Sequence, residues 1–306
     1  MQNQYAISVQ NINKSYGDLV ALKDISFEVE RGEIFGLIGP DGAGKTSLFQ
    51  ILTTLMLPSG GSASIEGKDV IAAYKKIRKT IGYMPGRFSL YQDLTVIENL
   101  TFFATIFGTT VEKNYDLIKD IYQQIEPFKN RRAGQLSGGM KQKLALSCAL
   151  IHKPDVLFLD EPTTGVDAVS RNEFWDMLQR LKEKDISILV STPYMDEASR
   201  CDRIALMQKG EILSINTPEA IIGEYQHKLY AVATNNRFQL LQDLRQYPET
   251  VSVFSFGHQL HLSLPTDLNE KDLTSFLTKR GHGDIQIEAI QANIEDCFMD
   301  LLRMNK

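Results

Sequence analysis

Cysteine is scarce in this chain of 306 residues, which contains three, Cys148, Cys201 and Cys297. They are odd in number and widely spaced, so neither a disulfide framework nor a zinc site is indicated. The simplest interpretation is that all three are small buried side chains in a reducing cytosol.

Basic charge and long apolar runs are missing as well. The net charge is −5, which argues against broad electrostatic binding to nucleic acid or anionic lipid. No apolar run approaches the ~20 residues of a membrane-spanning helix, and the start of the chain lacks the pattern of a signal peptide. With 43% hydrophobic and 23% charged residues, we expect a soluble globular protein with one ordinary and one smaller domain.

The sequence does contain a phosphate loop, because residues 39–47 fit the pattern G-x-x-x-x-G-K-[ST]. The glycines let backbone N–H groups point at phosphate oxygens, the lysine adds a charge, and the threonine offers a hydroxyl to Mg²⁺. An apolar run at 33–38 precedes the loop as a strand, and residues 45–56 follow as a helix whose N-terminus faces the anion. The residues predicted to bind a nucleoside triphosphate are Gly39, Pro40, Asp41, Gly42, Ala43, Gly44, Lys45, Thr46 and Ser47.

A second signal is the segment V-L-F-L-D-E at 156–161, which reads as a buried strand ending in two carboxylates. We expect Asp160 to hold Mg²⁺, directly or through water, opposite Thr46. Glu161 is expected to orient or deprotonate the water that attacks the γ-phosphate. A solvated acidic strand end is the alternative, but a phosphate loop in the same chain requires such a strand.

Two further features are weaker when taken alone. Tyr16 stands upstream of the loop and is able to stack on adenine, although on spacing alone a core or hairpin aromatic is more common. Leu136–Met140 reads L-S-G-G-M and opens a helix that extends to about His152. Its glycines suit an anion-binding helix N-terminus, although an ordinary helix cap is the better interpretation of the pentapeptide by itself.

The pattern of the remaining chain predicts an α/β fold in which buried strands alternate with helices. Strands at 6–10 and 25–29 are expected to form an antiparallel layer around a turn at 14–17. Helical periodicity covers 95–127 and 168–184.

From about residue 227 the predicted order is β-α-β-β-α-β plus a helix, which suggests a small ferredoxin-like domain. This tail has no clustered catalytic set, and His258, His261 and His282 are expected at the surface or in turns.

Together the phosphate loop, L-S-G-G-M and L-F-L-D-E-P at 157–162 closely resemble the nucleotide-binding subunit of ATP-binding-cassette (ABC) transporters. The resemblance implies a P-loop cassette over residues 1–225, with a mostly parallel sheet wound with helices, an antiparallel β layer and a helical subdomain at about 87–152. The tail, 226–306, is similar to the appended α+β domain of bacterial drug-export ATPases. Residues 163–167 look like the family's D-loop.

The resemblance also implies roles for individual residues. Tyr16 falls at the adenine-stacking position, and Asp167 lies in the D-loop. Ser137, Gly138 and Gly139 form the signature that touches ATP held by a second ABC subunit, in a homo- or heterodimer that closes head to tail. Integral membrane permease subunits are the other implied partners, and no nucleic acid is expected. The implied location is cytoplasmic, on the inner face of the cell membrane through the permease.

Two positions depart from the family pattern. Gly86 stands where the family has a glutamine, and Gln92 comes six residues too late to replace it. Pro193 stands where the family has a histidine that contacts the γ-phosphate, and proline has no side-chain donor. The chain's own site is therefore expected to bind ATP but to turn over slowly.

The resemblance further implies a docking surface for a permease helix near Arg87–Tyr91 and Phe102–Phe103. For the two phenylalanines, an equally good interpretation is that they fill the core of the helical subdomain. Two other functions remain open: a nucleotide-gated regulatory or assembly subunit with little hydrolysis, and a soluble non-transport ABC ATPase. The resemblance also implies that the transported substrate contacts the membrane subunits rather than this chain.

Overall fold

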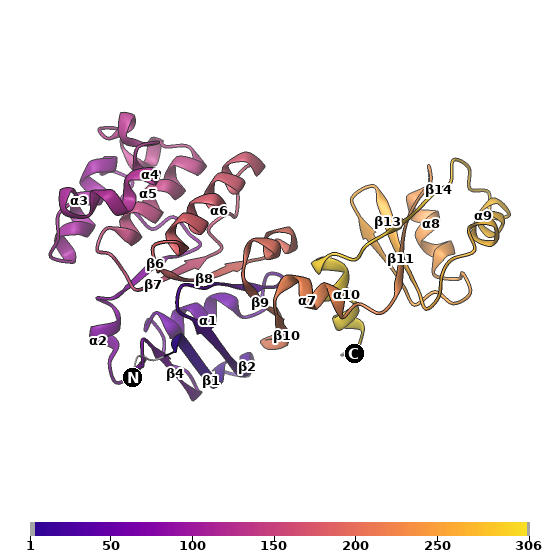
Figure 1. Cartoon of the computed structure of the whole chain (residues 1–306), viewed down its shortest axis with the longest axis horizontal. Helices are drawn as coiled ribbons and strands as arrows, with labels where there is room; N and C mark the ends of the chain where they lie inside the picture. Colours follow the sequence, from indigo (N-terminus) through magenta and orange to yellow (C-terminus); the bar gives the residue numbers. More distant parts are fainter. Residues whose placement is uncertain (1–3, 305–306) are drawn as a thin grey trace. The chain divides into compact units, whose positions relative to one another are not determined.

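A computed structural model of the chain describes residues 4–304. They divide into two compact units, residues 4–218 and 219–304, whose elements are labelled in Figure 1. The second unit thus begins a little before residue 226, where the sequence pattern places the boundary. In neither described unit does any helix have the length and apolar character needed to cross a membrane.

The first unit is built on a central sheet, whose strands are β3 (Ile34–Ile38), β6 (Ile81–Met84), β7 (Val156–Asp160), β8 (Ser187–Thr192), β9 (Arg203–Gln208) and β10 (Glu211–Asn216). Their spatial order is β10-β9-β3-β8-β7-β6, and all neighbours run parallel except the β9–β10 hairpin at one edge. Strands β3, β7 and β8 are buried along their whole length, which explains their largely apolar sequences.

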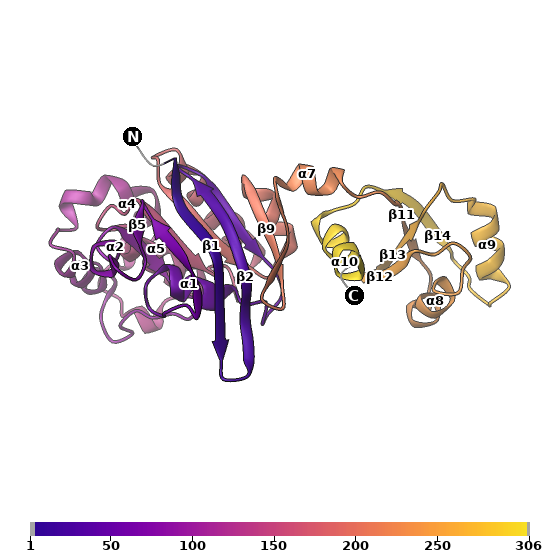
Figure 2. The same cartoon turned by 90° about the horizontal axis from the view of Figure 1, so that it is seen from below.

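A second, antiparallel layer is formed by β1 (Tyr5–Tyr16), β2 (Leu19–Glu30), β4 (Gly60–Ile65) and β5 (Lys68–Asp69). Figure 2 shows that β1 and β2 make one long hairpin. Both strands extend well beyond the predicted ranges. The turn predicted at 14–17 is placed too early, because it lies at 17–18 and only Gly17 belongs to it. Cross-strand pairing continues as far as Tyr16 and Leu19, so residues with turn-like composition are held in the ladder by their backbone partners.

The helices of the first unit are α1 (Lys45–Leu52), α2 (Tyr74–Ile77), α3 (Val96–Ile106), α4 (Tyr115–Tyr122), α5 (Gly138–Leu150) and α6 (Ala168–Lys182). Helix α1 contacts both the antiparallel layer and β7, whereas α6 contacts β3 and β8. Helices α3, α4 and α5 gather into a separate helical group (Figure 1). The helical stretch predicted at 95–127 is interrupted because Gly108 adopts a left-handed φ of 68° just after α3.

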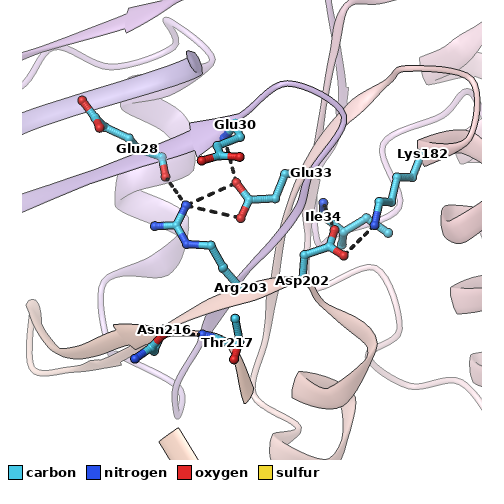
Figure 3. Close-up of polar contacts among 9 residues, drawn as sticks. All are labelled: Glu28, Glu30, Glu33, Ile34, Lys182, Asp202, Arg203, Asn216 and Thr217. Carbon is cyan, nitrogen blue, oxygen red and sulfur yellow. Dashed lines mark hydrogen bonds and ion pairs between the residues drawn. The ribbon is translucent and has the colours of Figure 1, made fainter. Parts of the chain in front are cut away.

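The start of β3 is fixed by a cluster of charged side chains (Figure 3). Asp202 accepts a hydrogen bond from the backbone N–H of Ile34 at 2.9 Å and another from Lys182 at 2.5 Å. Arg203 lies 3.3 Å from the buried carboxylate of Glu33. Burial raises the pKa of Glu33, against the opposing effects of a backbone hydrogen bond from Glu30 and the charge of Arg203.

Residues 219–304 include most of α7 (Pro218–Gly223), and their main elements are β11 (Lys228–Ala233), α8 (Arg237–Leu244), β12 (Ser252–Phe256), β13 (Gln259–Leu264), α9 (Glu270–Thr278), β14 (Gln286–Ile290) and α10 (Ile294–Met304). The antiparallel sheet has the order β12-β13-β11-β14. From β11 to β14 the elements follow the β-α-β-β-α-β succession of a ferredoxin-like domain.

The expectation for two histidines of this unit is wrong. His261 and His282 are buried, and each is paired with a carboxylate from a distant element. His261 Nδ1 lies 2.7 Å from Asp296, and His282 Nε2 lies 2.9 Å from Asp243. These residues are unclustered in the sequence, so only the fold reveals their partners. The three cysteines are buried and free, as predicted.

Candidate functional site

The phosphate loop lies between the end of β3 and the start of α1, at the carboxyl edge of the central sheet. Gly44 is the N-cap of α1 with a φ of 101°, and no side chain caps the helix. The free N–H groups of the first turn can therefore serve an anion. A Cβ on Gly39 would lie 2.3 Å from the carbonyl oxygen of Met207, so this close approach of two backbones requires glycine.

Lys45 is buried at the centre of the loop, with a relative exposure of 3%. Its Nζ donates to the carbonyl oxygens of Gly39 at 2.7 Å and Pro40 at 3.0 Å. The same ammonium lies 3.1 Å from Oε1 of Glu161. These contacts hold the side chain along the inner face of the loop, where phosphate oxygens bind in loops of this pattern.

Asp160 ends β7 beside the first turn of α1 and is 3% exposed. Its Oδ1 accepts hydrogen bonds from Ser191 Oγ at 2.7 Å and Thr46 Oγ1 at 3.3 Å. Burial raises the pKa of Asp160, while the bonds from Ser191 and Thr46 oppose that rise.

A hydroxyl and a carboxylate are ligands that suit Mg²⁺, which commonly takes few protein ligands and completes its shell with water and phosphate. Thr46 and Asp160 supply such a pair. Over residues 4–304 no group of three or more His, Cys, Asp and Glu side chains gathers as a candidate metal site. The site therefore fits a magnesium–nucleotide complex better than a dedicated protein metal centre.

Glu161 follows Asp160 with a φ of 50°, in the left-handed region that is uncommon for residues other than glycine. Its backbone N–H points to Ser191, with the carbonyl oxygen at 3.1 Å and Oγ at 3.0 Å. The turn redirects the chain, and the carboxylate of Glu161 faces Lys45.

The phosphate loop from Asp41 to Ser47 lines one pocket of about 450 Å³ together with Glu161, whereas the predicted site residues Gly39, Pro40 and Asp160 lie outside that lining. Tyr16 lines it and is 43% exposed, with its hydroxyl 3.2 Å from Ser47 Oγ, so this aromatic stands at the end of the hairpin rather than in the core. The pocket is lined by Tyr16, Leu19, Val20, Ala21, Asp41, Gly42, Ala43, Gly44, Lys45, Thr46, Ser47, Glu161 and Lys209.

Sequence reasoning missed Leu19, Val20, Ala21 and Lys209 in this lining. Lys209 is carried by the β9–β10 turn, where the N–H of Gly210 donates to the carbonyl oxygen of Ala43 at 3.0 Å. The Lys-Gly pair signals a turn in the sequence, but nothing local shows that this turn is attached to the phosphate loop.

The signature residues do not line this pocket. Ser137 is the N-cap of α5, and its Oγ accepts from the N–H of Met140 at 3.4 Å. Gly138 lines a separate pocket of about 160 Å³ that also includes Gly86 and Glu161. Gly139 packs near Ser170 of α6.

Asp167 likewise serves as a helix cap, because its side chain accepts from the N–H of Ser170 at 3.0 Å and caps α6. That hydrogen bond lowers the pKa of Asp167. Asp167 and the signature residues are thus ordered by their own helices rather than by the chain's own phosphate loop.

The two departures from the family pattern lie around Asp160 and β8. A Cβ on Gly86 would come within 2.9 Å of the carbonyl oxygen of Asp160, so the loop runs too close for any larger residue without a shift. Pro193 follows β8, whose last residue Thr192 donates to Glu197 at 2.6 Å. Gln92 is absent from the lining of the Lys45 pocket, and its carbonyl oxygen accepts from Gly134.

Comparisons with known proteins place this site in a family context. Residues 22–164 match the family model described as ABC transporter. The chain is 36% identical over 303 residues to the Nod factor export ATP-binding protein I of Rhizobium sp. (strain N33), covering 98% of this chain and 97% of the relative. It is 40% identical over 215 residues to the "Probable multidrug ABC transporter ATP-binding protein YbhF" of Escherichia coli (strain K12), covering 70% of this chain but 37% of that relative.

Solved structures share the fold of the first unit. The cbiO1 subunit from Clostridium perfringens, part of the ABC transporter complex cbiONQ, aligns with a TM-score of 0.65 and 27% identity, over 72% of this chain and 92% of that one. The dimeric cassette MJ0796, in a post-hydrolysis state bound to ADP and Pi, aligns with a TM-score of 0.63 and 26% identity, over 69% of this chain and 98% of that one. The predicted α/β P-loop cassette fold is confirmed.

Proposed function

Because the chain belongs to the ABC transporter family of ATP-binding proteins, we propose that it binds and hydrolyses ATP to drive a bacterial exporter. The observation that carries the proposal is the pocket in which Tyr16, the phosphate loop and Glu161 meet. The names of the relatives, which refer to multidrug and Nod factor export, support the direction of transport. Nothing in these names favours a purely regulatory or non-transport ATPase.

In this proposal Thr46 and Asp160 would hold Mg²⁺, and the bound ion would supply positive charge next to the phosphate oxygens. Lys45 binds the terminal phosphates, and to do so it exchanges the carbonyl oxygens of Gly39 and Pro40 for phosphate oxygens. The same exchange loosens the ion pair with Glu161, whose carboxylate then becomes free to orient or deprotonate the attacking water.

A second ABC subunit completes the site in this proposal. Support comes from the fact that Ser137, Gly139 and Asp167 lie outside the lining of the pocket that contains Lys45. In a head-to-tail pair, the signature of this chain would therefore contact ATP held by the phosphate loop of the second subunit, which is either another copy or a related protein. Closure on ATP and opening after hydrolysis would transmit work to membrane partners because ATP binds the closed pair better.

We further propose that the chain's own site turns over slowly. Gly86 and Pro193 offer no side-chain donor to the γ-phosphate or the attacking water, and one such donor is typically worth about 10²–10³ in rate. The retained Glu161 supports residual hydrolysis. In a heterodimer, the faster site would combine the partner's phosphate loop with this chain's signature.

The permease is proposed to dock beside Gly86, which places the protein on the inner face of the cell membrane. A pocket of about 240 Å³ with mainly apolar lining lies there, between β6 and the helical group, and includes Leu90, Phe103 and Phe107. Phe102 and Phe103 are half-buried, so they contribute both to packing and to this surface. Membership of cbiO1 in a larger transporter complex supports a partner of this kind.

The proposal is tested by measuring the ATPase rate of the purified chain alone and with candidate partner subunits. Slow hydrolysis by the chain alone and faster hydrolysis in the assembled complex support it. Brisk hydrolysis by the isolated chain would contradict the slow-site part, and absence of Mg²⁺-dependent ATP binding would overturn the whole.

Docking is tested with Phe88→Asp, which should leave ATP binding intact and prevent assembly with the permease. Phe128→Asp is the matched control because each aromatic ring lies beneath a cationic side chain, Lys141 and Arg131 respectively. Loss of assembly in both variants would indicate unfolding rather than a lost docking contact.

A further inference from the structure

We propose that Ser191 is a positioning residue for both carboxylates of the active site. The proposal rests on the function proposed above, in which Asp160 holds Mg²⁺ and Glu161 directs the attacking water. Ser191 belongs to none of the phosphate loop, the signature and the D-loop. Its role is inferred from the contacts of one buried hydroxyl.

Ser191 sits near the carboxyl end of β8, directly across from Asp160 in the parallel pairing of β7 and β8. Its relative exposure is 0%. The hydroxyl donates to Oδ1 of Asp160 at 2.7 Å, the shorter of the two hydrogen bonds that reach this oxygen. The bond from Thr46 is longer, at 3.3 Å. Both bonds end on Oδ1, so Oδ2 takes part in neither of them.

The same oxygen of Ser191 also accepts the backbone N–H of Glu161 at 3.0 Å. Glu161 has the left-handed φ of 50°, a conformation that persists in a residue with a side chain only where the surroundings hold it. One hydroxyl therefore contacts both the carboxylate proposed to bind the metal and the backbone turn that aims the next carboxylate. The carbonyl oxygen of Ser191 accepts the same N–H at 3.1 Å and supports that turn as well. The hydroxyl uses both its donor and its acceptor capacity, and an alanine side chain at this place would have neither.

The hydrogen bond from Ser191 gains importance from the small number of side chains that reach Asp160. Thr46 and Ser191 are the two side chains whose hydrogen bonds orient Asp160. If Mg²⁺ draws Thr46 into its own coordination, Ser191 becomes the hydrogen-bonding partner that keeps Asp160 in place. Residues that hydrogen-bond to metal ligands typically change metal affinity by about 10–100-fold when they are removed.

The test uses two substitutions at this position in the full-length chain. Ser191→Ala removes the hydroxyl, and Ser191→Cys replaces it with a somewhat larger thiol that is a much weaker donor. ATP binding to each variant is measured by calorimetry in EDTA and over a series of MgCl₂ concentrations. We expect both variants to raise the half-saturating Mg²⁺ concentration about tenfold and to bind ATP normally in EDTA.

The matched control is Ser187→Ala at the other end of the same strand. Ser187 is also buried and its Oγ also accepts a backbone N–H, from Gly32 at 3.0 Å. This variant should leave the Mg²⁺ requirement unchanged, although it loses a buried hydroxyl of the same kind. If Ser187→Ala shifts the Mg²⁺ requirement as much as Ser191→Ala, or if Ser191→Cys behaves like the parent, the positioning role is overturned.

Asp160→Asn separates this inference from the proposed function. A raised Mg²⁺ requirement in Asp160→Asn together with an unchanged one in Ser191→Ala would overturn only the role of Ser191. An unchanged Mg²⁺ requirement in Asp160→Asn would instead overturn the proposed metal site, and the inference with it.

Discussion

Two groups of residues with different proposed roles are built differently. On the holding side, Lys45, Thr46, Asp160 and Glu161 are connected by hydrogen bonds and an ion pair, partly through Ser191. The sensing side consists of Gly86 and Pro193, which lie outside the lining of the Lys45 pocket and have no polar side chain. Under the proposed function, the difference means that holding a triphosphate and sensing its γ-phosphate are separable properties, since this chain keeps the groups proposed for the first and lacks two groups for the second.

The strongest test of this comparison is Glu161→Gln. Loss of the general base should lower the hydrolysis rate by about a hundredfold or more, because general-base catalysis typically contributes about 10²–10⁴. ATP affinity should be retained, since Lys45 loses an ion-pair competitor. Steady-state ATPase assays and calorimetry measure the two effects.

The control for this test is Glu173→Gln, which breaks a Glu–Lys pair of similar length, 2.8 Å to Lys143, outside the pocket lining. It should leave the hydrolysis rate unchanged. If Glu161→Gln hydrolyses ATP as fast as the parent chain, Glu161 is not the catalytic base.

Lys45→Ala addresses the holding side directly. Removing the ammonium should weaken ATP binding by about 10–100-fold, because a hydrogen bond to a charged group is typically worth about 1.5–3 kcal/mol. Calorimetric titration with Mg²⁺–ATP measures the loss. Lys153→Ala is the control, since Lys153 is an exposed lysine outside the pocket lining and should bind ATP like the parent. Unchanged affinity in Lys45→Ala would contradict the proposed site.

The sensing side is tested by restoring the missing groups one at a time. Pro193→His should raise the hydrolysis rate of the chain's own site about tenfold, because it returns a side-chain donor. Gly86→Gln should give little or no gain alone, since its Cβ would crowd the carbonyl oxygen of Asp160 at 2.9 Å. Equal gains from both substitutions would show that the loop at Gly86 moves freely.

The smallest effect is expected from Glu33→Gln, at the other end of β3, where ATP binding and hydrolysis should not change. Because the pKa of Glu33 is raised by burial, the folded state takes up a proton before the unfolded state does. As pH falls from 7 towards 4.5, the parent should therefore gain thermal stability relative to the variant, by no more than about 3 °C. This gain is lost again as pH rises through the raised pKa. Melting curves at several pH values measure the difference, and a difference independent of pH would contradict it.

Much of the fold follows from local pattern. The buried strands β3, β7 and β8 are apolar enough to be recognised, and the phosphate loop is defined by its residue types and spacing. Both carboxylates of the site follow from their place at the end of one such strand. The expectation of buried cysteines also holds, because the chain has few of them and no pattern that would use them.

The parts that could not be predicted depend on contacts between distant segments. The length of the β1–β2 hairpin is set by cross-strand pairing that overrides the turn-like composition at 14–17. Lys209 reaches the pocket through a hydrogen bond between two loops, and Ser191 acquires its contacts from a neighbouring strand. His261 and His282 are buried because each finds a carboxylate more than thirty residues away along the chain.

The sheet order of the second unit has a consequence for synthesis. Strand β11 is the first strand of that sheet to be synthesised, yet one of its two neighbours, β14, is the last of the four to leave the ribosome. Until Gln286–Ile290 has emerged, one edge of β11 exposes unpaired N–H and C=O groups that can template pairing with another nascent chain. Translation that stops shortly before this segment would therefore yield a product with a finished first unit and an aggregation-prone tail.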